Sequence, residues 1–191
     1  MPGFVVAEAD YDEAMALFLS PLRLTQLNGN LGPTLTALPP THPLFADMTH
    51  LGLRNWHISG LVDIEDTRSH VSFMPRLTHL SFEDGRFIPH CTYILETCRL
   101  LHVLISLSFD SELSLFPDEL EDLSRDPRFV VMQNGWHLQD WQMGIHAGVD
   151  YWTRAEDFIA KRRCKEIDPL GYKISGDASE YIAARYASST G

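Results

Sequence analysis

Three histidines recur in closely similar surroundings, and imidazole is a side chain that can bind metal or titrate near neutral pH. They stand in the segments Met48-Thr49-His50-Leu51, Leu77-Thr78-His79-Leu80 and Leu100-Leu101-His102-Val103. If the segments are neighbouring parallel strands, about 4.8 Å apart, the three rings form a ladder on one sheet face. A metal site would need Cys, Asp or Glu in the same register, and the sequence has none there. We therefore interpret the ladder as part of a protein-binding face, and a metal site or enzyme as the less favoured alternative.

The motif that carries the histidines predicts the fold. Leu24-Thr25-Gln26-Leu27 is an earlier copy, in which Gln26 takes the histidine position, and a weaker copy begins at Phe129. From Leu24 to Phe129 the first residues of the copies are 24, 29, 23 and 29 residues apart. Such periods, with an L-x-x-L-x-L core, are typical of leucine-rich repeats. The sequence thus predicts an α/β fold: a short, irregular leucine-rich-repeat-like solenoid with parallel strands over residues 1–135, and a partner-binding face containing Gln26, His50, His79 and His102.

Helices must connect these strands if the strands are parallel. After the strand predicted at 77–82, Pro89 suits a first helical position. The next apolar residues are spaced i, i+3, i+4 and i+7, which predicts one buried helix face. They are Cys91, Ile94, Leu95 and Cys98. We interpret the two cysteines as core residues rather than metal ligands.

The pattern changes after residue 135, and residues 136–170 are predicted to be a helical C-terminal cap. Thr153 and Glu156 fit a capping box at a helix start. The basic cluster 161–165 is interpreted as the end of that helix, where the helix dipole favours cations. A nuclear-import signal or an anion-binding patch is the alternative for this cluster. Residues 171–191 are predicted to be a partly mobile tail.

The sequence contains none of the local motifs that identify common enzymes. It has no dinucleotide or phosphate-binding glycine loop, no G-x-S-x-G turn and no H-E-x-x-H pair. We therefore expect no catalytic residues and no cofactor, and a chain that is not an enzyme.

Charge and cysteine content suggest where the chain works. The net charge of −11 argues against binding nucleic acid or an anionic membrane, since both require a basic face. No apolar run approaches the roughly 20 residues that span a bilayer. Three cysteines are too few for a disulfide framework. The expected location is the cytoplasm or nucleus.

Several segments together resemble one known family. They are Pro75-Arg76-Leu77-Thr78-His79-Leu80, Leu95-Glu96-Thr97-Cys98, Asp126-Pro127-Arg128-Phe129-Val130-Val131, Asp140-Trp141, Gly148-Val149-Asp150-Tyr151-Trp152 and Ala155-Glu156-Asp157-Phe158-Ile159-Ala160. Over roughly residues 45–167 the chain resembles the F-box-associated leucine-rich-repeat proteins of mushroom-forming fungi.

The resemblance implies a function in ubiquitin ligation. In such proteins an F-box binds the adaptor of a cullin-type ligase, and the repeats bind the substrate. Residues 1–20 show no Leu-Pro-x-Glu opening and are too short for an F-box. The expectation is therefore the repeat half alone: a recognition module for an unknown protein, or the substrate-receptor half of a ligase, with the cullin adaptor as an indirect partner.

Overall fold

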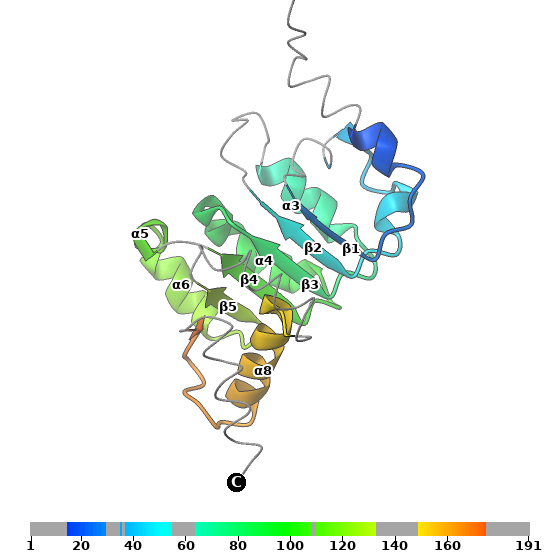
Figure 1. Cartoon of the computed structure of the whole chain (residues 1–191). Helices are drawn as coiled ribbons and strands as arrows, with labels where there is room; N and C mark the ends of the chain where they lie inside the picture. Colours follow the sequence, from blue (N-terminus) through cyan, green and yellow to red (C-terminus); the bar gives the residue numbers. More distant parts are fainter. Residues whose placement is uncertain are drawn as a thin grey trace, which may run out of the picture.

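In the described part of the chain, six parallel strands form a single sheet in which their order is the order of the sequence (Figure 1). The computed structural model describes residues 15–29, 35, 37–54, 64–107, 110–132 and 149–174. The strands are β1 (Gln26–Gly29), β2 (His50–Leu53), β3 (His79–Phe82), β4 (Val103–Leu107), β5 (Phe129–Met132) and β6 (Lys173–Ile174). The predicted α/β class with parallel strands is confirmed.

Helical segments occur between the strands, as parallel connections require. Residues 15–19 are helical. Residues 35 and 37 are helical too. Further helices are η1 (Pro43–Phe45), α3 (Ile64–Ser72), η3 (Gly85–His90), α4 (Cys91–Thr97), α5 (Asp110–Leu113), α6 (Pro117–Ser124) and α8 (Tyr151–Arg163). Pro117 is at the start of α6, where its missing N–H costs nothing.

The larger hydrophobic core lies between the sheet and helices α3, α4 and α6. Alternate strand residues point into it because side chains of a strand alternate between faces. Leu51, Leu80, Leu104 and Phe129 are all fully buried there and pair across the sheet. The predicted apolar face of α4 is confirmed, since Cys91 and its spaced partners are buried in this core.

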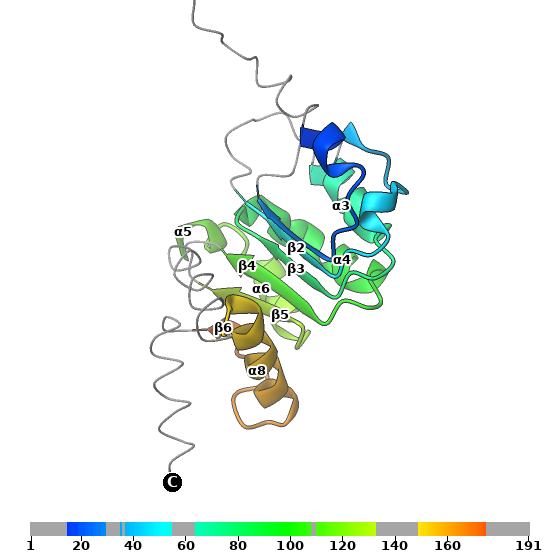
Figure 2. The ribbon, with the colours of Figure 1, turned by 45° about the vertical axis from the view of Figure 1, so that its right-hand side comes forward.

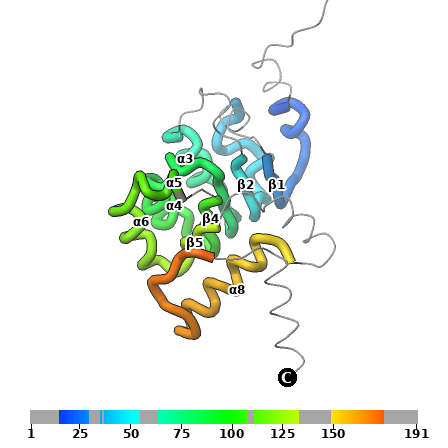
Figure 3. Tube along the Cα trace, turned by 60° about the vertical axis from the view of Figure 1, so that its left-hand side comes forward, coloured from blue at the N-terminus to red at the C-terminus, as the bar shows by residue number. Residues whose placement is uncertain are grey.

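The second core lies on the opposite face, where α8 packs against β4 and β5. Val103, Ile105 and Val130 meet Ala155 and Ile159. Figure 3 shows α3, α4 and α6 on one side of the sheet and α8 on the other. Strands β4 and β5 are therefore buried on both faces. The helix expected within 136–170 exists as α8, and it covers part of a sheet face. Residues 133–148 lie outside the described residues, and with them the first part of the predicted cap. Residues 175–191, which are most of the predicted tail, also lie outside.

The strand register corrects one part of the sequence analysis. His79 pairs with Val103, not with His102. The successive core partners Leu27, Leu51, Leu80, Leu104 and Phe129 are 24, 29, 24 and 25 residues apart. The alignment that the motif at 100–103 predicts is thus one residue out of phase, because two adjacent leucines fit the same position. Leu101 is the buried one and Leu100 is half exposed.

The C-terminal part of α8 is fixed by Arg162, whose side chain is 2% exposed. Its guanidinium donates to the carbonyl oxygens of Ser124, Asp126, Pro127, Phe129 and Pro169. These carbonyls belong to the chain entering β5 and to the turn after α8. Arg162 therefore holds α8 against the β5 end of the sheet. Figure 2 shows α8 beside β5.

Candidate functional site

The face of the sheet that carries α8 changes character from one edge to the other. Two rows of side chains cross it at right angles to the strands. The first row is Gln26, His50, His79 and Val103, and the second is Asn28, Gly52, Ser81, Ile105 and Val130. The first row is polar on β1–β3 and apolar on β4. The second row is polar on β1 and β3, has glycine on β2, and is apolar on β4 and β5. We call the β1–β3 part of these rows the polar strip: Gln26, Asn28, His50, Gly52, His79 and Ser81.

The first turn of α8 lies at the boundary between the two parts. Tyr151 is buried, and its hydroxyl accepts a hydrogen bond from Asn28 Nδ2 at 3.2 Å. The same hydroxyl lies 3.4 Å from Ser81 Oγ. Burial raises the pKa of Tyr151 above its usual value, so the phenol stays neutral. Tyr151 thus contributes its ring to the apolar core and its hydroxyl to the polar strip.

Glycine at position 52 leaves space for this arrangement. A β-carbon there would lie 2.8 Å from the Asn28 carboxamide, closer than such atoms approach in proteins. Asn28 can therefore lie over β2 and reach Tyr151 only because residue 52 has no side chain. The absence of a side chain at Gly52 therefore sets where the Asn28 carboxamide lies in the polar strip.

His50 and His79 stack in the polar strip as the sequence predicts for neighbouring strands. Their ring centroids are 4.0 Å apart and the rings are nearly parallel, at 7°. Trp152 of α8 meets both rings edge-on, at centroid distances of 5.6 Å and 5.5 Å. Glu156, one turn further along α8, places Oε1 3.0 Å from His79 Nε2. Two strands and one helix thus bring two imidazoles, one indole and one carboxylate together.

A threonine precedes each stacked histidine and orients its ring. Thr49 Oγ1 donates to the carbonyl oxygen of Thr25 and lies 2.9 Å from His50 Nδ1. Thr78 Oγ1 donates in the same way to Thr49 and lies 2.8 Å from His79 Nδ1. Burial is the largest influence on both imidazoles and lowers their pKa values, while Glu156 opposes the decrease at His79.

The four residues predicted to bind a partner therefore have different surroundings. Gln26 is exposed and His50 is partly exposed, whereas His79 is only 7% exposed under α8. His102 is exposed but stands in the register position of Thr78, outside the rows of the strip. The structure brings His50 and His79 together with Gln26. It corrects the expectation that all four side chains form one open face.

Three contributors to the site come from α8 and had no predicted role in binding: Tyr151, Trp152 and Glu156. Their spacing in the sequence does carry a signal, because i and i+4 residues share a helix face. That signal places Trp152 beside Glu156. It does not say which sheet face the helix covers.

An ion pair lies close to the carboxyl ends of the same strands. Arg54 Nε donates to Glu83 Oε1 at 3.0 Å, and Glu83 is 8% exposed. The two residues follow β2 and β3 directly. They form a third row beyond the polar strip, with charges largely screened from solvent.

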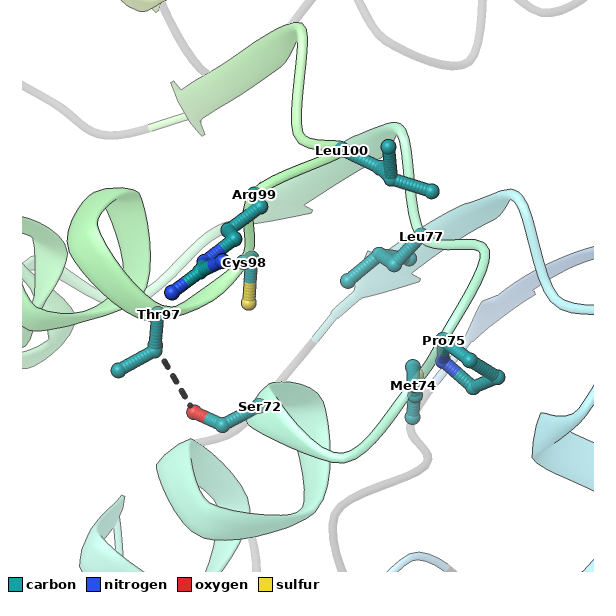
Figure 4. A pocket seen from close by; sticks show the side chains of 8 residues that line it. All are labelled: Ser72, Met74, Pro75, Leu77, Thr97, Cys98, Arg99 and Leu100. Carbon is teal, nitrogen blue, oxygen red and sulfur yellow. Dashed lines mark hydrogen bonds between the residues drawn. The ribbon is translucent and has the colours of Figure 1, made fainter.

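A separate pocket of about 180 Å³ opens at the other end of the strands, between the ends of α3 and α4 (Figure 4). Its lining combines Ser72, Met74, Pro75, Leu77, Thr97, Cys98, Arg99 and Leu100. Ser72 Oγ and Thr97 Oγ1 approach to 3.2 Å at one side of it. Burial raises the pKa of the Cys98 thiol, which makes it a weaker nucleophile.

Within the described ranges, no group of three or more His, Cys, Asp or Glu side chains is arranged to hold a metal ion. In the same part of the chain, no helix is both long and apolar enough to cross a membrane. The chain matches no model of a protein family, no curated protein and no solved structure. The geometry of the site therefore carries the functional argument.

Proposed function

We propose that this chain is a protein-recognition module, built as a short irregular leucine-rich-repeat solenoid, whose partner binds the open part of the polar strip over β1 and β2. The observation that carries the proposal is the division of one sheet face. Over β4 and β5 the face is apolar and α8 covers it, whereas over β1 and β2 it is polar and accessible. Parallel sheets are normally covered on both faces.

The solenoid part of the proposal is supported by connectivity. Successive strands pair in sequence order, and their core residues recur at intervals of 24 to 29 residues. A repeat array of this kind extends a surface rather than enclosing a cavity. Binding through that surface is the function that such an architecture favours.

The chemistry of the strip indicates the kind of partner. Gln26 and Asn28 offer exposed amide groups, and His50 adds a partly exposed imidazole. Trp152 stands at the boundary, and tryptophan is among the residues enriched in binding hot spots. Amide and imidazole groups pair with backbone and polar side chains, so the expected ligand is a protein surface rich in hydrogen-bonding groups. The proposal assigns no catalytic step and no cofactor to the chain.

Affinity capture with a matched pair of variants tests the proposal. The tagged chain is exposed to an extract of its native cells, and the captured proteins are quantified by mass spectrometry. Gln26→Arg places a long cation on the strip, and Thr92→Arg places the same cation on the outer face of α4, where residue 92 is also exposed. We expect one partner to be lost with Gln26→Arg and kept with Thr92→Arg.

Two other results would reject the proposed interface. Equal capture by both variants would place binding elsewhere, and no specific partner with the unmodified chain would reject recognition itself. The ligase alternative shares this recognition step and adds one partner. Recovery of the cullin adaptor together with the ligand would favour a substrate receptor.

A further inference from the structure

Strand β1 is the last strand at one edge of the sheet, and within the described residues it has a neighbour on one side only (Figure 1). In a parallel pair, the backbone groups of successive residues point alternately to the two sides of a strand. Thr25 and Gly29 turn their carbonyl oxygens towards β2, whose backbone N–H groups donate to both. The N–H and carbonyl groups of Gln26 and Asn28 therefore point away from β2, and both residues are exposed.

This edge of β1 has the backbone pattern with which β3 binds β2. The β3 residues in the same rows as Gln26 and Asn28 are His79 and Ser81. On β3, His79 donates its backbone N–H to the carbonyl oxygen of Thr49 on β2. Because Gln26 occupies the equivalent position, its outward N–H is placed to donate to a further parallel strand in the same way.

The larger hydrophobic core is also less complete at this edge. Leu27 begins the row of core residues that continues through Leu51, Leu80 and Leu104. The three later leucines are fully buried, whereas Leu27 is only partly buried. An apolar side chain in this row of a further strand would bury Leu27 as its neighbours are buried.

The charges just before the strands indicate another residue that a further strand would carry. Four positions before the core leucines of β1, β2 and β3 stand Arg23, Asp47 and Arg76. Asp47 Oδ1 lies 3.0 Å from Arg76 Nη1, and Asp47 Oδ2 lies 3.8 Å from Arg23 Nη1. The Arg23 side chain is 85% exposed. An acidic residue at the same position of a further strand would contact Arg23 as Asp47 contacts Arg76.

We propose that β1 binds an extended segment of a partner protein, which joins the sheet as a parallel strand. The identity of this segment rests on the proposed function, because it belongs to the partner that binds the polar strip. The segment carries an acidic residue beside Arg23, an apolar residue beside Leu27 and polar residues beside Gln26 and Asn28. In such pairing the backbone hydrogen bonds supply affinity and the alternate side chains supply specificity. A second copy of the strand from β1 would not supply the acidic residue, because residues 20–29 contain none.

A synthetic peptide with the sequence of residues 46–54 is the probe, because β2 already has this pattern of acidic, polar and apolar residues. On β2 the carbonyl oxygens of Thr49 and Leu53 face β3, so the backbone of Leu51 faces β3 and that of Gly52 faces β1. Two N-methylated peptides form a matched pair. Methylation at Leu51 removes a donor that would face β1 of the full chain, whereas methylation at Gly52 removes a donor that would face solvent.

Hydrogen exchange of single amides, followed by nuclear magnetic resonance in the full chain, is the readout. In the free chain at low concentration we expect rapid exchange at Gln26 and Asn28, and slow exchange at Leu27 and Gly29, which bond to β2. The unmodified and the Gly52-methylated peptides should slow exchange at Gln26 and Asn28 about tenfold at saturation. The Leu51-methylated peptide should bind about tenfold more weakly.

A pair of variants of the chain tests the charged contact. Arg23→Ala should weaken binding of the unmodified peptide about threefold, as expected for an exposed ion pair. Arg163→Ala removes the same charge from an exposed position of α8 and should leave the affinity unchanged. Equal affinities of the two variants would contradict the acidic position of the segment.

Four results would overturn the addition of a partner strand. Slow exchange at Gln26 and Asn28 in the free chain would show that the chain covers this edge itself, and slow exchange only at high concentration would assign the edge to a second copy. The other two are equal binding of the methylated peptides and no binding of any peptide. None of these results depends on partner capture. A partner that is lost with Gln26→Arg, in a chain that does not bind the peptide, would leave the proposed function standing and reject the added strand.

Discussion

Replacement of Arg162 by methionine tests how α8 is held against the sheet. Methionine fills a similar stem volume but supplies no donor, so the carbonyl oxygens around the guanidinium lose their partner. Three of the hydrogen bonds are short, at 2.5 Å to Ser124, 2.8 Å to Pro169 and 2.9 Å to Phe129. A hydrogen bond to a charged group contributes about 1.5 kcal/mol or more. Counting only these three, the free energy of unfolding should fall by about 4.5 kcal/mol.

Urea unfolding followed by circular dichroism measures this loss. Arg163→Met is the control, because Arg163 is the adjacent residue on the same helix and is exposed. The control should change the free energy of unfolding by less than about 0.5 kcal/mol. Arg162→Lys should fall between the two, since an ammonium has three donors and no planar fork. A loss below about 1 kcal/mol in Arg162→Met would refute the view that this guanidinium fastens α8.

Two further substitutions probe the two faces of the sheet. Leu80→Asp places a carboxylate at a fully buried position of the larger core, and we expect no cooperative unfolding transition to remain in urea; a variant as stable as the parent would contradict the strand register. Tyr151→Phe removes the hydroxyl that Asn28 donates to and should lower the free energy of unfolding by about 1 kcal/mol, measured against Tyr93→Phe on the exposed side of α4. Equal losses in the two tyrosine variants would show that the hydroxyl contact with the strip contributes nothing.

The parallel strands could be predicted because each strand copies a short motif with core leucines at fixed positions. Leu51 and Leu80 recur with the same threonine and histidine before them, and those positions are paired in the sheet. At the fourth copy this local signal is ambiguous, because Leu100 and Leu101 both fit. A slip of one residue exchanges the two faces of a strand. The slip explains why the sequence pattern places His102 in the ladder, where the structure has Val103.

The residues of β4 and β5 themselves indicate that these strands are covered on both faces, which the repeat pattern does not predict. Val103–Leu107 and Phe129–Met132 are apolar at nearly every position, whereas β1–β3 carry polar residues at alternate positions. A strand that is apolar on both faces is covered on both faces. The change from alternating to continuous apolar sequence thus indicates a second layer over β4 and β5. It does not identify α8 as that layer, because the contact spans residues far apart in the sequence.

The start of α8 shows why the role of Glu156 was not predicted. Thr153 and Glu156 satisfy the local capping pattern, but the N-cap is Asp150, whose Oδ1 accepts hydrogen bonds from both the backbone N–H and the hydroxyl of Thr153. With Asp150 as the cap, the backbone N–H and the hydroxyl of Thr153 already have an acceptor, and Glu156 does not cap the helix. It then lies one turn after Trp152, on the helix face that meets His79. The helix therefore begins three residues earlier than the capping pattern predicts. Because of this, Glu156 lies within the helix, beyond its first turn, and faces the polar strip.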